Sequence, residues 1–65
     1  MQIRHFHDTD TLYIEFRPIQ VADTKGLEED TQVDLDKAGN IGAITFEHAS
    51  RWADLPALHY EQIAA

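Results

Sequence analysis

The sequence predicts an α+β domain, in which a four- to five-stranded antiparallel β-meander sheet carries a C-terminal α-helix packed on one face. Three observations lead to this fold class. Residues 31–47 contain two strand-like runs joined by a turn, residues 2–17 contain a second such pair, and residues 49–65 change to helical spacing. With 65 residues there is room for one core, so we predict a single domain over 1–65, with the sheet in 1–48 and a helical segment in 49–65.

The stretch 31–47 is predicted to be a β-hairpin at the centre of the sheet. Val33 and Leu35 alternate with polar residues, which gives the period of two that is typical of a strand with one apolar face. Gly39 and Asn40, which tolerate positive φ well, then supply turn chemistry. The apolar run resumes over residues 41–46 as the second strand.

Residues 2–17 are predicted to form a second hairpin. Ile3 and His5 share one face of a short strand over 2–6, and a polar turn follows. Residues 11–17 form the next strand, which Pro18 ends by removing a backbone donor. A short edge strand is expected near 19–25, followed by a loop that holds Gly26 and an acidic run over 28–30.

The C-terminal stretch is expected to be helical. Apolar residues recur there at spacings of three and four: Trp52, Leu55, Leu58 and Ile63, with His59 among them. Because Pro56 is acceptable only near a helix start, we predict a first turn over 50–53. A helix over about 55–64 would follow, with Asp54 as its N-cap and its apolar stripe on the sheet.

Composition narrows the classes of partner. Five Lys and Arg stand against twelve Asp and Glu, which gives a formal net charge of −7. Nucleic-acid binding is not expected, since it depends on cations that replace condensed counterions, whereas a basic protein partner suits an acidic surface. The chain has no cysteine to staple it. A lone domain of this size is marginally stable, so a homodimer is expected.

The sequence also bears on location and on cofactors. Residues 1–5 enter a strand pattern without the apolar core of a signal peptide, and no run reaches membrane-spanning length. We therefore expect a cytoplasmic protein with no membrane association. No phosphate-cradling glycine loop, nucleophile elbow or Cys/His zinc framework is present, so no cofactor is predicted.

Several of these runs resemble a known family. The segments Asp10-Thr11-Leu12-Tyr13-Ile14 and, about twenty residues later, Val33-Asp34-Leu35-Asp36-Lys37-Ala38-Gly39 occur in the order found in the domain-of-unknown-function family 2283 of small prokaryotic proteins. An Ile-rich strand that ends in Ala49-Ser50 completes the similarity, which covers about 1–51. The resemblance implies a small sheet-and-helix fold and no established activity. Some members look like the smaller, acidic partner encoded beside a small toxin-like protein.

One group of residues is a candidate metal site. Residues two apart on a strand share a face, so His5 and His7 could present two imidazoles to one metal ion, with Asp8 or Asp10 as a third ligand. Imidazole suits zinc, nickel or copper. The alternative interpretation is a strand end with packed histidines and a turn made by the aspartates. No residue is predicted to be catalytic.

Three large residues of the C-terminal stretch, two of them aromatic, allow two interpretations. Trp52, Leu58 and Tyr60 belong either to the core, packed on the sheet, or to an exposed subunit interface, because aromatic residues anchor such surfaces.

The sequence favours a non-catalytic, homodimeric protein–protein interaction module. Its acidic surface or an open sheet edge would bind another protein, and its most specific form is an antitoxin-like partner of a basic protein. The alternative is a small metal-dependent enzyme or hydrolase whose site lies near His5, His7 and Asp10 at a dimer cleft.

Overall fold

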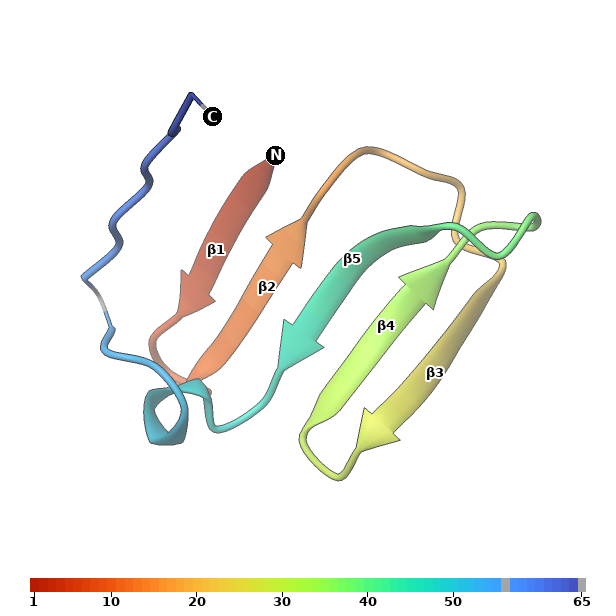
Figure 1. Ribbon diagram of the computed structural model, residues 1–65. Coiled ribbons are helices and arrows are strands. Elements are labelled where there is room, and N and C mark those ends of the chain that lie inside the picture. The colour runs from red at the N-terminus through yellow and green to blue at the C-terminus, as the bar shows by residue number, and fades with distance from the viewer. Residues whose placement is uncertain (56, 65) are drawn as a thin grey trace.

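A computed structural model describes residues 1–55 and 57–64. The strands β1 (Gln2–Phe6), β2 (Thr11–Glu15), β3 (Asp23–Glu28), β4 (Thr31–Leu35) and β5 (Ile41–Phe46) form one antiparallel sheet, which Figure 1 shows as a single layer. Their order across the sheet is β1-β2-β5-β4-β3. A 3-10 turn, η1 (Ala49–Arg51), follows β5. The described residues contain no helix that is long and apolar enough to cross a membrane.

Both predicted hairpins are confirmed. In the first, Ile3 pairs with Ile14, and in the second, Val33 pairs with Ile44. Because β2 also pairs Ile14 with Ile44, the two hairpins join at β5, which is the central strand. Residues opposite one another in an antiparallel pair share a face, so these apolar side chains form a row across four strands.

The predicted meander order is wrong. In a meander, β3 would pair with β2. Instead, the chain after β2 crosses the end of the sheet through residues 16–22 and enters β3 at the far edge (Figure 1). The crossing is fixed by the amide of Phe16, which donates to Gly42 O at 2.8 Å, and by that of Ala22, which donates to Leu35 O at 2.8 Å. Ile19 packs against Gly42, at a position where a Cβ atom would collide with it. The three consecutive strands β3, β4 and β5, with β2 beside β5, have Greek-key connectivity.

The bounds of two strands also differ from the prediction. The edge strand lies over 23–28 rather than 19–25, so that Gly26 and Glu28 belong to a strand and not to a loop. It contains a register shift between Gly26 and Glu28. The second strand ends at Glu15, because the amides of Phe16 and Arg17 already serve the crossover.

The predicted C-terminal α-helix is wrong, and with it the α+β class. Among the described residues the only helical element is η1, so the domain is essentially all-β. The stretch 54–64 is not helical where it is described, and residues 56 and 65 of the predicted segment lie outside the described residues. In Figure 1 this segment runs up the side of the sheet on which β1 lies.

Turn residues connect these strands. Gly39 has φ 87°, as its place in the β4–β5 turn predicts, and the other residues with positive φ in the described part of the chain are Asp10 and His48. Asp36 holds the same turn: its carboxylate accepts from the amides of Ala38 at 2.9 Å and Asn40 at 2.8 Å. These bonds, above all that from the Asn40 amide, lower the pKa of Asp36.

The buried core is small. Only Val33, Ala43 and Ala49 are buried among the apolar side chains described, and Thr31 is the buried polar one. No large side chain among them is fully buried. A single sheet layer has no second layer to pack against, which explains why so little of it is removed from water.

Candidate functional site

His5, His7 and Asp10 line an open hollow at one end of the sheet. The hollow has a volume of about 510 Å³, and Ser50 and Leu55 complete its lining. The β1–β2 hairpin supplies the first three residues, and the chain after β5 supplies the other two. The structure therefore brings the predicted metal-site residues together, and adds Ser50, which the sequence did not single out.

Asp10 is the centre of this group. Its carboxylate accepts hydrogen bonds from the Ser50 hydroxyl at 2.6 Å and from the Ser50 amide at 3.1 and 3.2 Å. His5 Nε2 lies 3.2 Å from Asp10 Oδ1. The bond from the Ser50 hydroxyl, followed by that from His5, lowers the pKa of Asp10, so the carboxylate is ionised at neutral pH. Since an ionised carboxylate can only accept hydrogen bonds, Nε2 of His5 carries the proton in this contact.

This arrangement differs from the catalytic triad of serine hydrolases. In a triad the serine hydroxyl donates to the histidine, whose other ring nitrogen donates to the aspartate. Here Asp10 lies between the two other residues, and its carboxylate accepts the hydrogen bond of the Ser50 hydroxyl directly. A carboxylate with a lowered pKa is a weak base, so this geometry does not activate Ser50 as a nucleophile.

The metal-site hypothesis receives limited support from the geometry. The rings of His5 and His7 are close, with centroids 6.3 Å apart, but they meet edge to face at 71°. Within 1–55 and 57–64, no group of three or more His, Asp or Glu side chains is arranged to hold a metal ion. Metal binding by His5, His7 and Asp10 therefore stays a prediction.

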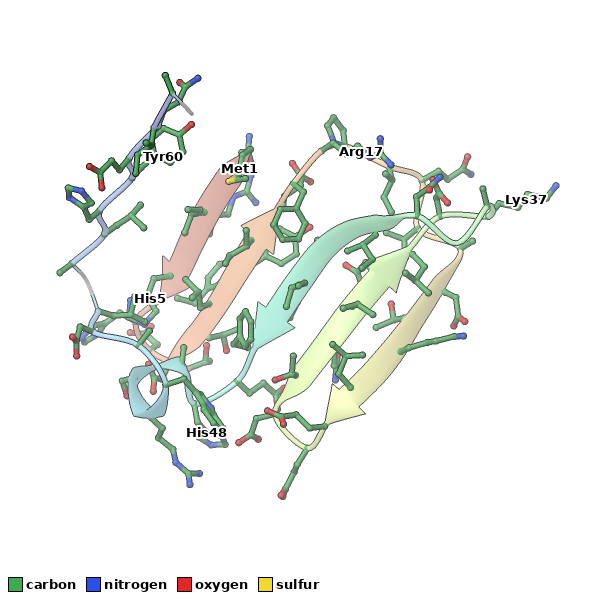
Figure 2. The ribbon with its side chains drawn as sticks, in the orientation of Figure 1. Met1, His5, Arg17, Lys37, His48 and Tyr60 are labelled. Carbon is green, nitrogen blue, oxygen red and sulfur yellow. The ribbon has the colours of Figure 1, made fainter. Side chains whose placement is uncertain are left out.

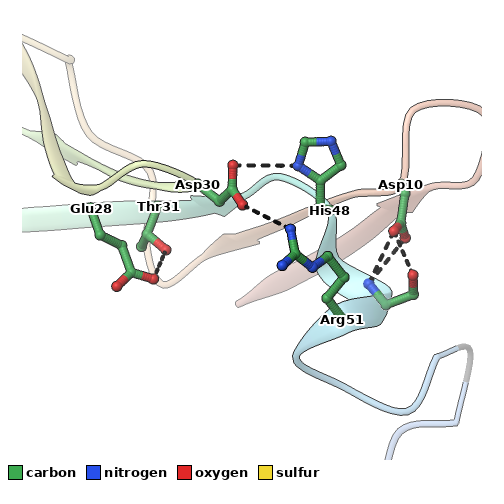
Figure 3. Close-up of polar contacts among 7 residues, drawn as sticks. Asp10, Glu28, Asp30, Thr31, His48 and Arg51 are labelled. Carbon is green, nitrogen blue, oxygen red and sulfur yellow. Dashed lines mark hydrogen bonds and ion pairs between the residues drawn. The ribbon is translucent and has the colours of Figure 1, made fainter.

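A second polar cluster, which sequence reasoning missed, lies at the same end of the sheet (Figure 3). Asp30, in the β3–β4 turn, accepts from His48 Nδ1 at 3.3 Å and lies 4.0 Å from the Arg51 guanidinium. Its carbonyl also accepts from the amide of Glu47 at 2.8 Å. The acidic run 28–30 predicts a solvated turn, and no local signal links it to residues 47–51.

Together, Asp10 in the β1–β2 turn and Asp30 in the β3–β4 turn fasten these turns to the chain that leaves β5. The Ala49 amide donates to Asp10 O at 2.8 Å, and the Glu47 amide does the same for Asp30. His48, between these two donors, has φ 54°, a left-handed conformation that bends the chain between the two contacts. This network therefore holds the lower end of the sheet in Figure 1 together, and its chemistry is structural.

The three large C-terminal residues predicted to belong to the core or to an interface are not in the core. Trp52, Leu58 and Tyr60 have 61%, 69% and 79% of their surface exposed, because the helix that would have buried them does not form. Figure 2 shows Tyr60 on the C-terminal segment, beyond the β1 side of the sheet. Their role in a subunit interface stays a prediction.

The edge formed by β3 is acidic and accessible. All six residues of β3 are exposed, and β4 is the only strand that pairs with it. Asp23 and Glu28 lie on β3, with Glu29 in the following turn, and Lys25 is the only cation on the strand. Asp34 of β4 faces the same region, where it accepts from the Thr24 hydroxyl at 2.8 Å.

Comparison with known proteins confirms the family resemblance. The family model described as "Protein of unknown function (DUF2283)" matches residues 2–50, which include all five strands. No curated protein and no solved structure matches the chain.

Proposed function

The chain belongs to the DUF2283 family, whose description names no activity, and we propose that it is a non-catalytic protein–protein interaction module that binds a basic partner along the β3 edge. The observation that carries the proposal is the exposure of all of β3 beside a concentration of carboxylates. An unpaired edge strand can accept an extended segment by adding it as a further strand, with backbone hydrogen bonds supplying affinity.

Charge selects the kind of partner. Asp23, Glu28 and Glu29 surround a strand with one lysine, so a segment rich in Lys or Arg gains complementary contacts there. The regular part of β3, over 23–26, offers the pairing surface, because the register shift between Gly26 and Glu28 disturbs the strand beyond it. An antitoxin-like role, in which a small acidic chain binds a basic protein, is the most specific form of this proposal.

A metal-dependent hydrolase at a dimer cleft is the second candidate. The hollow beside His5, His7 and Asp10 is the observation in its favour. This candidate is less well supported, because the Asp10 carboxylate already accepts hydrogen bonds from Ser50 and His5, and the site provides no activated nucleophile.

Titration with a basic strand-forming peptide tests the proposal. We expect a peptide of alternating lysine and valine to shift the backbone amide NMR signals of residues 23–26, and the matching glutamate–valine peptide to leave them unchanged. Binding should weaken as salt rises, because the attraction involves exposed charges.

Two double variants with the same change in net charge provide the control. Asp23→Lys with Glu29→Lys should weaken binding on the order of tenfold, because both charges lie beside the edge. Asp8→Lys with Glu47→Lys changes two exposed carboxylates outside β3 and should weaken binding much less. Equal effects of the two double variants, or amide shifts centred away from β3, would contradict the proposal.

A further inference from the structure

The molecule exposes more surface than its mass predicts. Its accessible surface is 5335 Å², whereas a folded monomer of 7.4 kDa is expected to expose about 4,200 Å². The difference of about 1,100 Å² is comparable to the area, about 800 Å², that one partner contributes to a standard protein interface. The fold thus has enough surplus surface for a stable interface.

One face of the sheet is the best site for such an interface. Cross-strand pairing places two rows of side chains on this face, from β1 to β4. The first row is Ile3, Ile14, Ile44 and Val33, and the second is His5, Leu12, Phe46 and Thr31. We call these eight residues the apolar face. These eight include no Asp, Glu, Lys or Arg, and only two of them are buried. The rows continue on β3 with Lys25 opposite Val33 and Glu28 opposite Thr31, so charge on this side of the sheet begins at the β3 edge.

The C-terminal segment borders this face without covering it. Leu55 and Leu58 lie across an open hollow of about 400 Å³ from Ile3, Leu12 and Ile14. Leu58 is nonetheless 69% exposed, and Trp52, where the segment begins, is 61% exposed. The segment therefore extends the apolar surface beyond the sheet.

We propose that the apolar face, extended by Trp52 and Leu58, is a homodimer interface in which the sheets of two copies pack face to face. Area identifies the second copy as the occupant. The surplus of about 1,100 Å² suits one partner's share of a standard interface, and a face-to-face pair buries the same apolar rows on both copies. Two copies of net charge −7 repel one another least across these rows, because the nearest carboxylates, Glu28 and Asp54, lie at the two ends of the face. Two sheets packed about 10 Å apart form a β-sandwich, which supplies the second layer that the single sheet lacks.

This inference is independent of the basic partner. The β3 edge lies at the opposite side of the sheet from β1 and stays accessible when two apolar faces meet. The two proposals are therefore tested separately: a folded monomer that binds the peptide contradicts only the dimer, and a dimer that does not bind the peptide contradicts only the basic partner.

Two substitutions in β1 test the face with a matched design. Ile3 and Phe6 are 41% and 49% exposed on the same strand, but they point to opposite faces. We expect sedimentation velocity of the untagged chain to show a dimer. Ile3→Lys should raise the dimer dissociation constant at least about tenfold, since it places a charge in an apolar interface. Phe6→Lys should leave it unchanged.

Trp52→Ser is the second test, and it decides the question if Ile3→Lys fails to fold by circular dichroism. Trp52 lies outside the sheet and is exposed, so its loss should weaken the dimer without disturbing the strands. A wild-type chain that stays monomeric at high concentration, or a dimer that Phe6→Lys weakens as much as Ile3→Lys, would overturn the proposal. A dimer that neither Trp52→Ser nor a folded Ile3→Lys weakens would do the same.

Discussion

At the scale of single residues, two aspartates determine how the turns of this protein are joined. Asp10 reaches Ser50, forty positions along the chain, and Asp30 reaches His48, eighteen positions along. Aspartate in a turn commonly bonds its own neighbours, as Asp36 does with Ala38 and Asn40. Turn chemistry alone predicts local bonds for all three aspartates, and only the surrounding fold gives Asp10 and Asp30 partners far along the chain.

Acid stability should report on Asp10. The hydrogen bond from the Ser50 hydroxyl lowers the pKa of Asp10 in the folded protein. The ionised form therefore stabilises the fold above the unfolded pKa of about 3.9, and this contribution is lost as the pH falls through the lower folded pKa. We expect Asp10→Asn to be less stable than the wild type at pH 7 and to lose less stability on acidification.

Urea unfolding at pH 7 and at several values below pH 4 measures this difference. Asp8→Asn is the control, because Asp8 is exposed in the same turn. If Asp10→Asn and the wild type lost stability in parallel over the acidic range, the proposed contribution of Asp10 would be wrong.

At the scale of elements, the crossover and β5 depend on one close contact. Gly42 lies beneath Ile19, and its carbonyl also accepts the amide of Phe16 at 2.8 Å. The segment that carries Ile19 is thus anchored to the strand that it covers. This contact explains a glycine in the central strand, where glycine is otherwise unfavourable.

Gly42→Ala should lower the free energy of unfolding by about 1–3 kcal/mol, because its Cβ atom would displace Ile19. Gly26→Ala is a matched control in β3, where an added Cβ has only the Glu28 carbonyl at 4.0 Å, and it should change stability by less than about 0.5 kcal/mol. Chemical denaturation of both variants makes the comparison. Equal losses at the two sites would show that chain flexibility, and not the Ile19 contact, is responsible.

Two elements show where sequence patterns misled the prediction, and each has a physical reason. β3 is exposed along its whole length, so it has no apolar face and no period of two to reveal it. The C-terminal stretch has helical spacing, but an isolated helix of about ten residues is marginal in water without a packing surface. Pro56 also disfavours helical geometry at Leu55.

At the scale of the whole molecule, three buried apolar side chains among the described residues, two in the sheet and one in η1, make a small core for an independent fold. If the dimer supplies the missing layer, folding and association are linked, and stability depends on protein concentration. The melting temperature should then rise by about 5 °C for each tenfold increase in concentration.

Differential scanning fluorimetry across two decades of concentration measures this dependence, with Trp52 as the intrinsic probe. Ile3→Lys should melt at a temperature that varies much less with concentration, whereas Phe6→Lys should behave like the wild type. A wild-type melting temperature that did not change over this range would contradict the link between folding and association.

The sequence by itself determined both hairpins, the turn at Gly39 and the family, because each rests on a period or a motif within a short stretch of chain. It also brought His5, His7 and Asp10 to attention, and these residues do lie together. Only the tertiary structure decided the strand order, the roles of Ser50 and His48, and the absence of an α-helix after β5 among the described residues. These features depend on contacts between residues far apart in the chain, which leave no local pattern.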